Sequence, residues 1–172
     1  NSLTVRLPHV LDWLARTQVD VLGVQELKMV DEKFPHAAFA ELGYECAAFG
    51  QKTYNGVAFI SRLPLQDVVR GNPHFADEHS RLIAATVNGV RIVNGYFVNG
   101  QEPGSDKFAY KMRWLDGLQQ YVAQELAAHP RLALLGDFNI TYDDRDTYDP
   151  IALAETIHHT SEERAHLQAL LA

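Results

Sequence analysis

Hydrophobic residues recur along this chain with two periods, one typical of helices and one typical of strands. Between Val5 and Thr17 they return every three or four positions, which predicts an amphipathic helix. The longest helical pattern covers Lys107–His129, and Pro130 ends it. Shorter helical patterns cover Asp31–Leu42 and Glu162–Ala172.

Short apolar runs between these segments predict strands. The runs are Val19–Glu26, Tyr44–Phe49, Val57–Ser61, Leu65–Val69, Arg81–Val87, Val90–Phe97 and Leu132–Leu135. Asn88–Gly89 predicts a type I′ hairpin, and the turn-rich loop that ends in Asn55–Gly56 predicts a second hairpin. Because the strands come in hairpins, we predict an α/β sandwich with mixed, largely antiparallel sheets.

Composition narrows the class of protein. A length of 172 residues suits one domain over residues 1–172, and 47% hydrophobic residues exclude disorder. Fifteen basic and 22 acidic residues give a net charge of −7, which argues against a general basic coat but allows a local basic rim around an acidic metal site. Cys46 is the single cysteine and no membrane-spanning or secretory segment is visible, so we expect a cytoplasmic protein.

The strongest candidate chemistry follows the strand Leu132–Leu135. Gly136 allows a bend, and Asp137 and Asn139 would point to the same side of an extended chain while Phe138 anchors in the core. A carboxylate beside a carboxamide can supply a base, a metal ligand and a hydrogen-bond donor. The alternative is an ordinary turn after a strand.

Two other strands also finish on polar side chains. Glu26 ends one strand, and Tyr96 lies near the end of another, with Asn99 shortly after it. We expect these strand ends to meet Asp137 at one edge of the sheet pair. For Glu26 the alternative is a solvated strand end.

Aromatic and basic residues suggest contacts with nucleic acid. Tyr54, beside Asn55, could stack on a nucleic acid strand or be an ordinary aromatic residue of a turn. Lys107, Lys111 and Arg113 lie early in the long helix, where cations oppose the helix dipole. They are either there for a phosphate backbone or solvated.

Six segments in order resemble the exodeoxyribonuclease III family of abasic-site endonucleases, within the endonuclease/exonuclease/phosphatase superfamily. They are Asn1–Leu3 with Arg6, Val24–Lys28, Tyr54–Ala58, Ser80–Ile83, Asn94–Asn99 and Leu135–Asn139. The resemblance implies a four-layered α/β sandwich that cuts DNA 5′ to abasic sites and removes nucleotides or blocking groups from 3′ ends. It also implies dependence on Mg²⁺, with Mn²⁺ as a substitute, and a monomer acting on double-stranded DNA.

The same resemblance implies roles for individual residues. Glu26, Asn1, Asp137 and Asn139 match positions at or near the metal. Asp137 matches the residue that orients or deprotonates the attacking water, Asn139 the donor that holds the scissile phosphate, and Tyr96 the tyrosine that contacts it. Tyr54, Asn55, Arg81 and Asn99 match positions that contact DNA or support the site.

The chain also departs from the family pattern. It begins after an asparagine of the family's first strand, and it lacks an Arg-Ile-Asp type motif and a Ser-Asp-His motif. We therefore expect a truncated domain, incomplete at both ends and poorly active alone. The alternatives are a sibling phosphoesterase for inositol phosphates or phospholipids, and a non-catalytic DNA-binding fragment.

Overall fold

The computed structural model describes residues 3–171, so Asn1, Ser2 and Ala172 lie outside the description. The helices are α1 (Leu3–Thr17), α2 (His36–Ala40), α3 (Asp106–Ala128) and α4 (Ser161–Leu171), with 3-10 turns η1 (Asp31–Lys33) and η2 (Asp144–Asp146). The strands are β1 (Val21–Gln25), β2 (Glu45–Phe49), β3 (Val57–Ser61), β4 (Gln66–Arg70), β5 (Leu82–Val87), β6 (Val90–Tyr96) and β7 (Leu132–Asp137). Within residues 3–171, no helix is long and apolar enough to cross a membrane.

The strands form two sheets. The first has the order β1-β3-β2 and is antiparallel throughout, and the second has the order β4-β5-β6-β7, in which only β6 and β7 are parallel. Asn88 and Gly89, between β5 and β6, both have positive φ angles, of 48° and 73°. A type I′ turn requires this conformation, so the predicted hairpin is confirmed.

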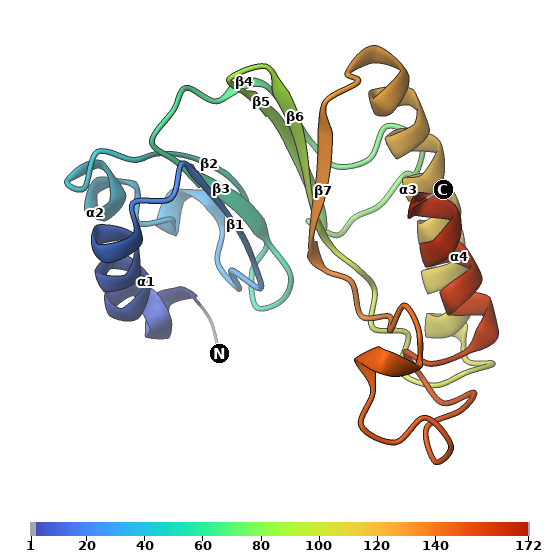
Figure 1. Cartoon of the computed structure of the whole chain (residues 1–172). Coiled ribbons are helices and arrows are strands. Elements are labelled where there is room, and N and C mark those ends of the chain that lie inside the picture. The colour runs from blue at the N-terminus through green and yellow to red at the C-terminus, as the bar shows by residue number, and fades with distance from the viewer. Residues whose placement is uncertain (1–2, 172) are drawn as a thin grey trace.

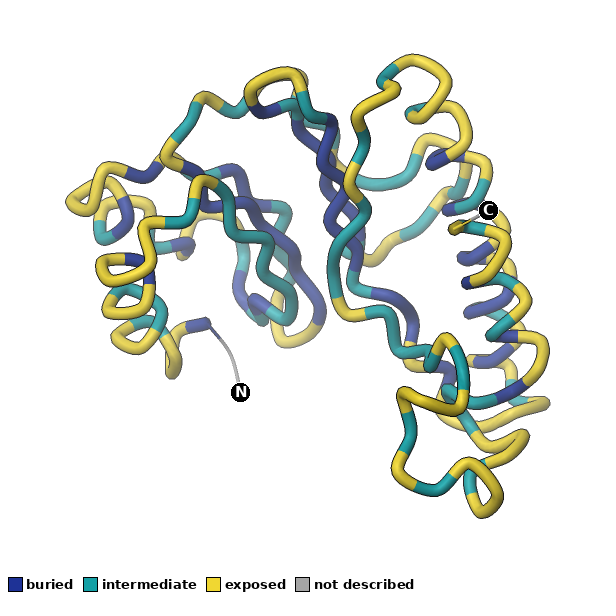
Figure 2. The backbone as a smooth tube through the Cα atoms, in the orientation of Figure 1, coloured by how far each residue is buried: buried dark blue, intermediate teal, exposed yellow. Residues whose placement is uncertain are grey.

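The sheets pack face to face, and helices cover both outer faces (Figure 1). α1 and α2 lie on the first sheet, and α3 and α4 lie on the second. Buried residues concentrate in the strands and on the inner sides of the helices (Figure 2). Three apolar cores fill the three interfaces, around Phe39, Phe59 and Trp114. The predicted four-layered sandwich with largely antiparallel sheets is confirmed.

The predicted helix over Asp31–Leu42 is wrong. The segment is divided into η1 and the five-residue helix α2. Pro35 lies between them and disfavours helical backbone in the residue before it. Phe34 accordingly is extended, with φ −66° and ψ 133°.

The predicted strand that ends on Glu26 is one residue too long at its carboxyl end. β1 ends at Gln25, because Glu26 has a left-handed backbone with φ 56°. Glu26 therefore leaves the ladder, and its side chain is free to turn toward the second sheet.

Candidate active site

Three strand ends meet at one edge of the sandwich. Tyr96 and Asp137 are the last residues of β6 and β7 and lie opposite each other in the parallel register. The Tyr96 hydroxyl donates a hydrogen bond to Oε1 of Glu26, at 2.7 Å. Since β1 and β6 belong to different sheets, this bond joins the sheets at the edge where Asp137 lies. The expected meeting of Glu26, Tyr96 and Asp137 is therefore confirmed as geometry.

A buried asparagine holds the two sheets in this relation. The Asn94 amide on β6 donates to the carbonyls of Val24 and Ala58, each at 3.1 Å, and its Oδ1 accepts from Gln25 at 2.7 Å. Asn94 is fully buried, so these bonds satisfy its polar atoms and set the position of β1 against β6. Glu26 follows Gln25 directly, so the hydrogen bonds of Asn94 also fix the position of Glu26 relative to Tyr96.

The surroundings of Glu26 and Tyr96 shift the pKa values of these two groups in opposite directions. The hydrogen bond from Tyr96, followed by the neighbouring Lys28, lowers the pKa of Glu26 below its usual range. Lys28 Nζ lies 3.0 Å from Glu26 Oε2. Burial and the bond to Glu26 raise the pKa of Tyr96 to about 12. At neutral pH the site therefore presents a carboxylate at Glu26 and a neutral phenol at Tyr96.

Asn139 adopts a different backbone from the one expected. Its φ of 47° breaks the strand alternation, so the prediction that Asp137 and Asn139 share a side of an extended chain does not hold. Instead the Asn139 amide nitrogen of the main chain donates to Asp137 Oδ1 at 3.2 Å, and its side-chain Nδ2 donates to the Phe97 carbonyl at 3.0 Å. Nδ2 carries a second hydrogen, which is available to a ligand. Phe138 packs against Phe97, with 4.7 Å between ring centroids, and anchors the strand end as expected.

Glu26 suits one kind of metal ion. Among residues 3–171, no three His, Cys, Asp or Glu side chains are grouped to hold a metal. Mg²⁺ does not need such a group, because it is commonly bound by one or two carboxylates and keeps its remaining ligands as water or substrate phosphate. A single ionised carboxylate at Glu26 fits that pattern. The predicted contribution of Asn1 falls outside the described residues.

Two of the predicted DNA-contact residues lie beside Tyr96. The Arg81 guanidinium lies 5.0 Å from the centre of the Tyr96 ring, and its Nη1 donates to the Tyr96 carbonyl at 3.2 Å. Arg81 and Asn99 line a depression of about 440 Å³, together with Lys107. Cationic and amide groups thus adjoin the strand ends, as contact with a phosphate backbone requires.

The other two predicted DNA-contact residues differ from each other. The side chain of Tyr54 is exposed, at 68%, and is available for stacking. Asn55 is only 7% exposed, and its amide donates to Gln51 Oε1 at 2.8 Å. The Asn55 carbonyl accepts from the Lys28 amide at 2.9 Å, so Asn55 supports the segment that carries Glu26.

Two residues lie near the site although the sequence did not place them there. His158 Nε2 lies 3.1 Å from Asn99 Nδ2, and burial lowers the pKa of His158, which keeps its ring neutral. Lys111, expected to be solvated or to face phosphate, is fully buried. A signal for Lys111 existed, since it lies on the apolar stripe of α3, three residues after Phe108 and four before Leu115.

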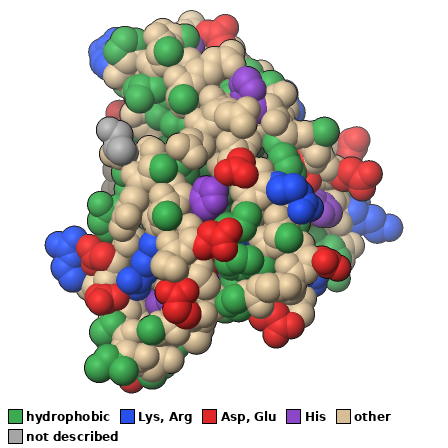
Figure 3. Space-filling view, turned by 90° about the vertical axis from the view of Figure 1, so that its right-hand side faces the viewer, with side chains coloured by type: hydrophobic (Ala, Val, Ile, Leu, Met, Phe, Trp, Pro, Cys, Tyr) green, Lys and Arg blue, Asp and Glu red, His purple; other side chains and the backbone are tan. Residues whose placement is uncertain are grey.

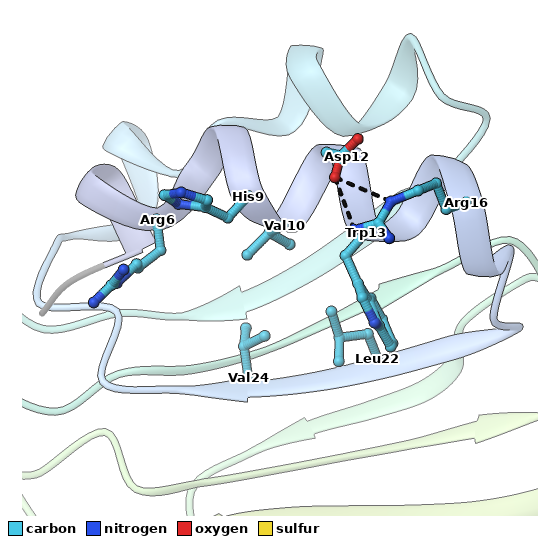
Figure 4. A pocket seen from close by; sticks show the side chains of 8 residues that line it. All are labelled: Arg6, His9, Val10, Asp12, Trp13, Arg16, Leu22 and Val24. Atoms are coloured by element: carbon cyan, nitrogen blue, oxygen red, sulfur yellow. Dashed lines mark hydrogen bonds and ion pairs between the residues drawn. The ribbon is translucent and has the colours of Figure 1, made fainter.

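Two other surfaces differ from the strand-end site. On the face of α3 and α4, acidic and basic side chains are interspersed (Figure 3), which does not favour DNA. A depression of about 550 Å³ lies between α1 and β1, with Trp13 and Leu22 in its wall (Figure 4). Among residues 3–171, its lining contains none of the predicted site residues.

Comparison with known proteins shows which protein family the chain belongs to. A sequence profile of the Endonuclease/Exonuclease/phosphatase family matches residues 4–158. The chain belongs to this family. Over 153 residues it is 34% identical to exodeoxyribonuclease III of Haemophilus influenzae, an alignment that covers 85% of this chain and 57% of that protein. The predicted resemblance to the exodeoxyribonuclease III group is thereby confirmed, and the chain spans little more than half the length of this relative.

Solved structures of the family superpose closely on the chain. It is similar to the 3′ phosphatase NExo from Neisseria bound to a product DNA hairpin, with a TM-score of 0.98 and 49% identity over 99% of this chain and 67% of that chain. NExo from Neisseria meningitidis is also described as a 3′-5′ exonuclease, and this structure has a TM-score of 0.97 and 50% identity, covering 99% of this chain and 67% of that one. An AP endonuclease from Archaeoglobus fulgidus has a TM-score of 0.94 and 31% identity, covering 99% of this chain and 66% of that one.

Proposed function

We propose that the protein is a divalent-metal-dependent DNA phosphoesterase that processes 3′ ends, removing terminal phosphates or nucleotides. The observation that carries this proposal is the meeting of Glu26, Tyr96 and Asp137 at one sheet edge. The 49% identity to a DNA-bound 3′ phosphatase over nearly the whole chain supports it. Double-stranded DNA with blocked 3′ ends is the proposed substrate.

The strand-end residues divide the work of hydrolysis. Asp137 orients a water molecule and accepts its proton as the water attacks phosphorus. Tyr96, a neutral phenol, and Asn139, with its second Nδ2 hydrogen, donate to the phosphate oxygens as negative charge builds on them. The bond between phosphorus and the 3′ oxygen breaks, the leaving oxygen takes a proton from solvent water, and the product DNA carries a 3′ hydroxyl.

Glu26 would hold the metal ion, for which we propose Mg²⁺, with Mn²⁺ as a substitute. When bound, such an ion polarises the phosphate and offsets its negative charge. The lowered pKa of Glu26 keeps this carboxylate ionised and ready for a cation across the neutral range. Lys28 neutralises the carboxylate until a metal competes for it.

Binding of DNA depends on local cations, because the chain as a whole carries a charge of −7. Arg81 and Lys107 supply positive charge beside Tyr96, and Asn99 supplies an amide in the same depression. Tyr54 supplies an exposed aromatic ring for stacking. Affinity should therefore fall with salt as these few phosphate contacts are screened.

Cutting 5′ to an abasic site is the second candidate activity, favoured by the similarity to the Archaeoglobus AP endonuclease. It breaks the same type of bond, between phosphorus and a 3′ oxygen, and leaves the same 3′ hydroxyl. One set of strand-end residues therefore serves both reactions. Which reaction takes place depends on whether the surrounding surface binds a 3′ end or an abasic site.

The test uses protein expressed from the complete reading frame. It is incubated with labelled duplexes that carry a 3′ phosphate, a recessed 3′ hydroxyl or one internal abasic site, first with Mg²⁺ and then with EDTA. Mg²⁺-dependent release of phosphate or terminal nucleotides supports 3′-end processing, and a single internal cut supports the second activity. If none of the duplexes changes, inositol phosphates and phospholipids are tested next, and DNA binding that survives EDTA without any cutting would indicate a non-catalytic binding protein.

A further inference from the structure

A buried ion pair lies directly behind the strand-end site. Lys111 of α3 and Glu163 of α4 form a salt bridge, and the exposed fraction of both side chains is 0%. The Lys111 ammonium group also donates to the main-chain carbonyls of Asn99, at 3.2 Å, and Asn139, at 2.8 Å. An ammonium group has three protons, so these three acceptors satisfy it completely.

Stability alone does not explain this arrangement. Burying two charges costs solvation free energy, and apolar replacements of buried ion pairs are often as stable as the originals. The distinctive feature is the pair of carbonyl acceptors. They belong to the loops that follow β6 and β7, and these loops carry the side chains of Asn99 and Asn139 into the site region.

The lysine stem also shapes the first of these loops. Gly100 has a φ of 91°, and a Cβ at this position would lie 2.9 Å from Lys111 Cδ. The loop after β6 therefore lies directly against the lysine side chain. The ammonium group and the stem together constrain the backbone at Asn99 and Gly100.

Glu163 connects this centre to the start of α4. Its Oε2 accepts from the Thr160 amide at 3.1 Å and from the Thr160 hydroxyl at 2.8 Å, which completes the capping box. The carbonyl of His158, just before the box, accepts from the amide and hydroxyl of Thr141 in the loop after β7. The amino end of α4 is thus joined to the same loop that Lys111 holds.

We propose that Lys111 and Glu163 are positioning residues of the active site, which set the main chain at Asn99 and Asn139 and thereby the placement of their side chains. This inference rests on the proposed function and deepens it. Lys111 is buried and does not contact the substrate. It acts through Asn139, whose Nδ2 must meet the phosphate, and through Asn99 at the edge of the DNA depression.

A second buried ion pair on the same helix provides a matched control. Arg91 of β6 pairs with Glu125 of α3, and their side chains are 3% and 13% exposed. Arg91 Nη1 also donates to a main-chain carbonyl, that of Asp67, at 2.8 Å. Arg91 lies opposite Leu132, at the end of the β6–β7 pair away from Asp137.

The experiment compares Lys111→Met/Glu163→Gln with Arg91→Met/Glu125→Gln, each in protein from the complete reading frame. Both double variants remove two opposite charges together, so neither leaves an unpaired buried ion. Steady-state kinetics on a 3′-phosphate duplex give kcat and KM separately. Hydrogen exchange measures how well the amides of residues 97–101 and 137–141 are protected.

We expect Lys111→Met/Glu163→Gln to lower kcat by about 10- to 100-fold with KM changed by less than about 3-fold, since small displacements of reacting groups have effects of this size. Exchange in the two loops should speed up. The Arg91→Met/Glu125→Gln control should keep its kcat within about 3-fold of the wild type. Should the first variant fail to fold, Lys111→Met/Glu163→Leu replaces it, because it adds apolar contacts in place of the buried amide.

Two outcomes overturn the proposal: a kcat within about 3-fold of the wild type in the variant at 111 and 163, or an equal loss of kcat in the control pair. Failure of the proposed function is distinguishable, because the wild type itself would then leave the duplexes unchanged. In that case hydrogen exchange alone decides, and unchanged protection of the two loops would overturn the positioning role.

Discussion

Arg91 and Asp137 lie at opposite ends of the β6–β7 strand pair, and their surroundings differ. At the amino ends of both strands, Arg91 of β6 is buried. Its guanidinium donates to Glu125, to the Asp67 carbonyl and to the Tyr121 hydroxyl. At the carboxyl end, Asp137 is exposed, and within residues 3–171 its carboxylate accepts one hydrogen bond, from the main chain of Asn139. One end directs its polar atoms into the protein, and the other keeps hydrogen-bonding capacity for a ligand.

The two ends thus separate polar groups that maintain the fold from polar groups that are available for chemistry. A buried polar group is held by partners that satisfy it, so its removal affects folding. A strand-end carboxylate with unused lone pairs affects little in the fold and is free to bind water, metal or substrate. Changes at the two ends should therefore separate activity from stability.

Asp137→Asn should have the largest effect on activity. Loss of the proposed base is expected to lower kcat by about 1,000-fold, within the range typical of general-base removal. DNA affinity, measured by fluorescence anisotropy, should stay close to that of the wild type. Asp116→Asn, on the exposed side of α3, is the control, and equal losses in both variants would contradict a specific role for Asp137.

Glu26→Gln should shift the metal requirement. An amide is a poorer ligand for Mg²⁺ than a carboxylate, and we expect the half-saturating concentration to rise by at least about 10-fold, because even residues that only support ligands have effects of this size. A titration of activity against Mg²⁺ measures the shift. Glu32→Gln, on the exposed turn η1, should leave the curve unchanged, and an unchanged curve for Glu26→Gln would exclude a ligand role.

Tyr96→Phe should slow cutting more than it weakens binding. It removes one donor to a charged phosphate oxygen, worth about 10-fold in kcat. A loss confined to KM would mean that Tyr96 only helps to hold DNA.

The ionisation of Tyr96 gives the same variant a spectroscopic test. Burial and Glu26 raise its pKa to about 12, so the folded protein holds the phenolic proton above the ordinary titration near pH 10. Subtracting the phenolate absorbance titration of Tyr96→Phe from that of the wild type should leave one group with a midpoint near 12. A midpoint near 10 would show that Tyr96 is not shielded in this way.

Tyr54→Ala should have a smaller effect, confined to DNA affinity. The exposed ring can contribute about 1 kcal/mol of stacking free energy, which corresponds to about 5-fold in Kd. Tyr54→Phe retains the ring face and should bind like the wild type. Equal affinity of the alanine and phenylalanine variants would remove Tyr54 from the DNA surface.

Arg91→Met tests the opposite end of the strand and should change activity least. Removing one partner leaves Glu125 largely buried and unpaired, which should lower the free energy of unfolding by about 3 kcal/mol. Urea denaturation measures this loss, while kcat of the folded protein should stay close to that of the wild type. A large fall in kcat would abolish the distinction between the two ends.

Local sequence patterns predicted most of the fold. They failed where the backbone conformation of a single residue departed from the pattern of its neighbours. The hairpin at Asn88–Gly89 was predictable, because its positive φ angles are a requirement of two adjacent residues. The helix predicted across Pro35 was wrong. The prediction rested on apolar spacing and neglected that proline disfavours helical backbone in the preceding residue, Phe34. The direction of the Asn139 side chain could not be predicted either, since its Nδ2 donates to the Phe97 carbonyl, which lies 42 residues away in sequence.

The strands, the hairpins and the polar residues at the strand ends could be predicted from the sequence, because periodicity and turn chemistry act over a few neighbouring residues. The burial of Lys111 and its hydrogen bonds to the loops at Asn99 and Asn139 depend instead on how distant segments pack together. Its charge is tolerated there because Glu163, 52 residues away in sequence, folds against it. Such a partner is selected by the packing of α4 on α3, and no local pattern around Lys111 contains it.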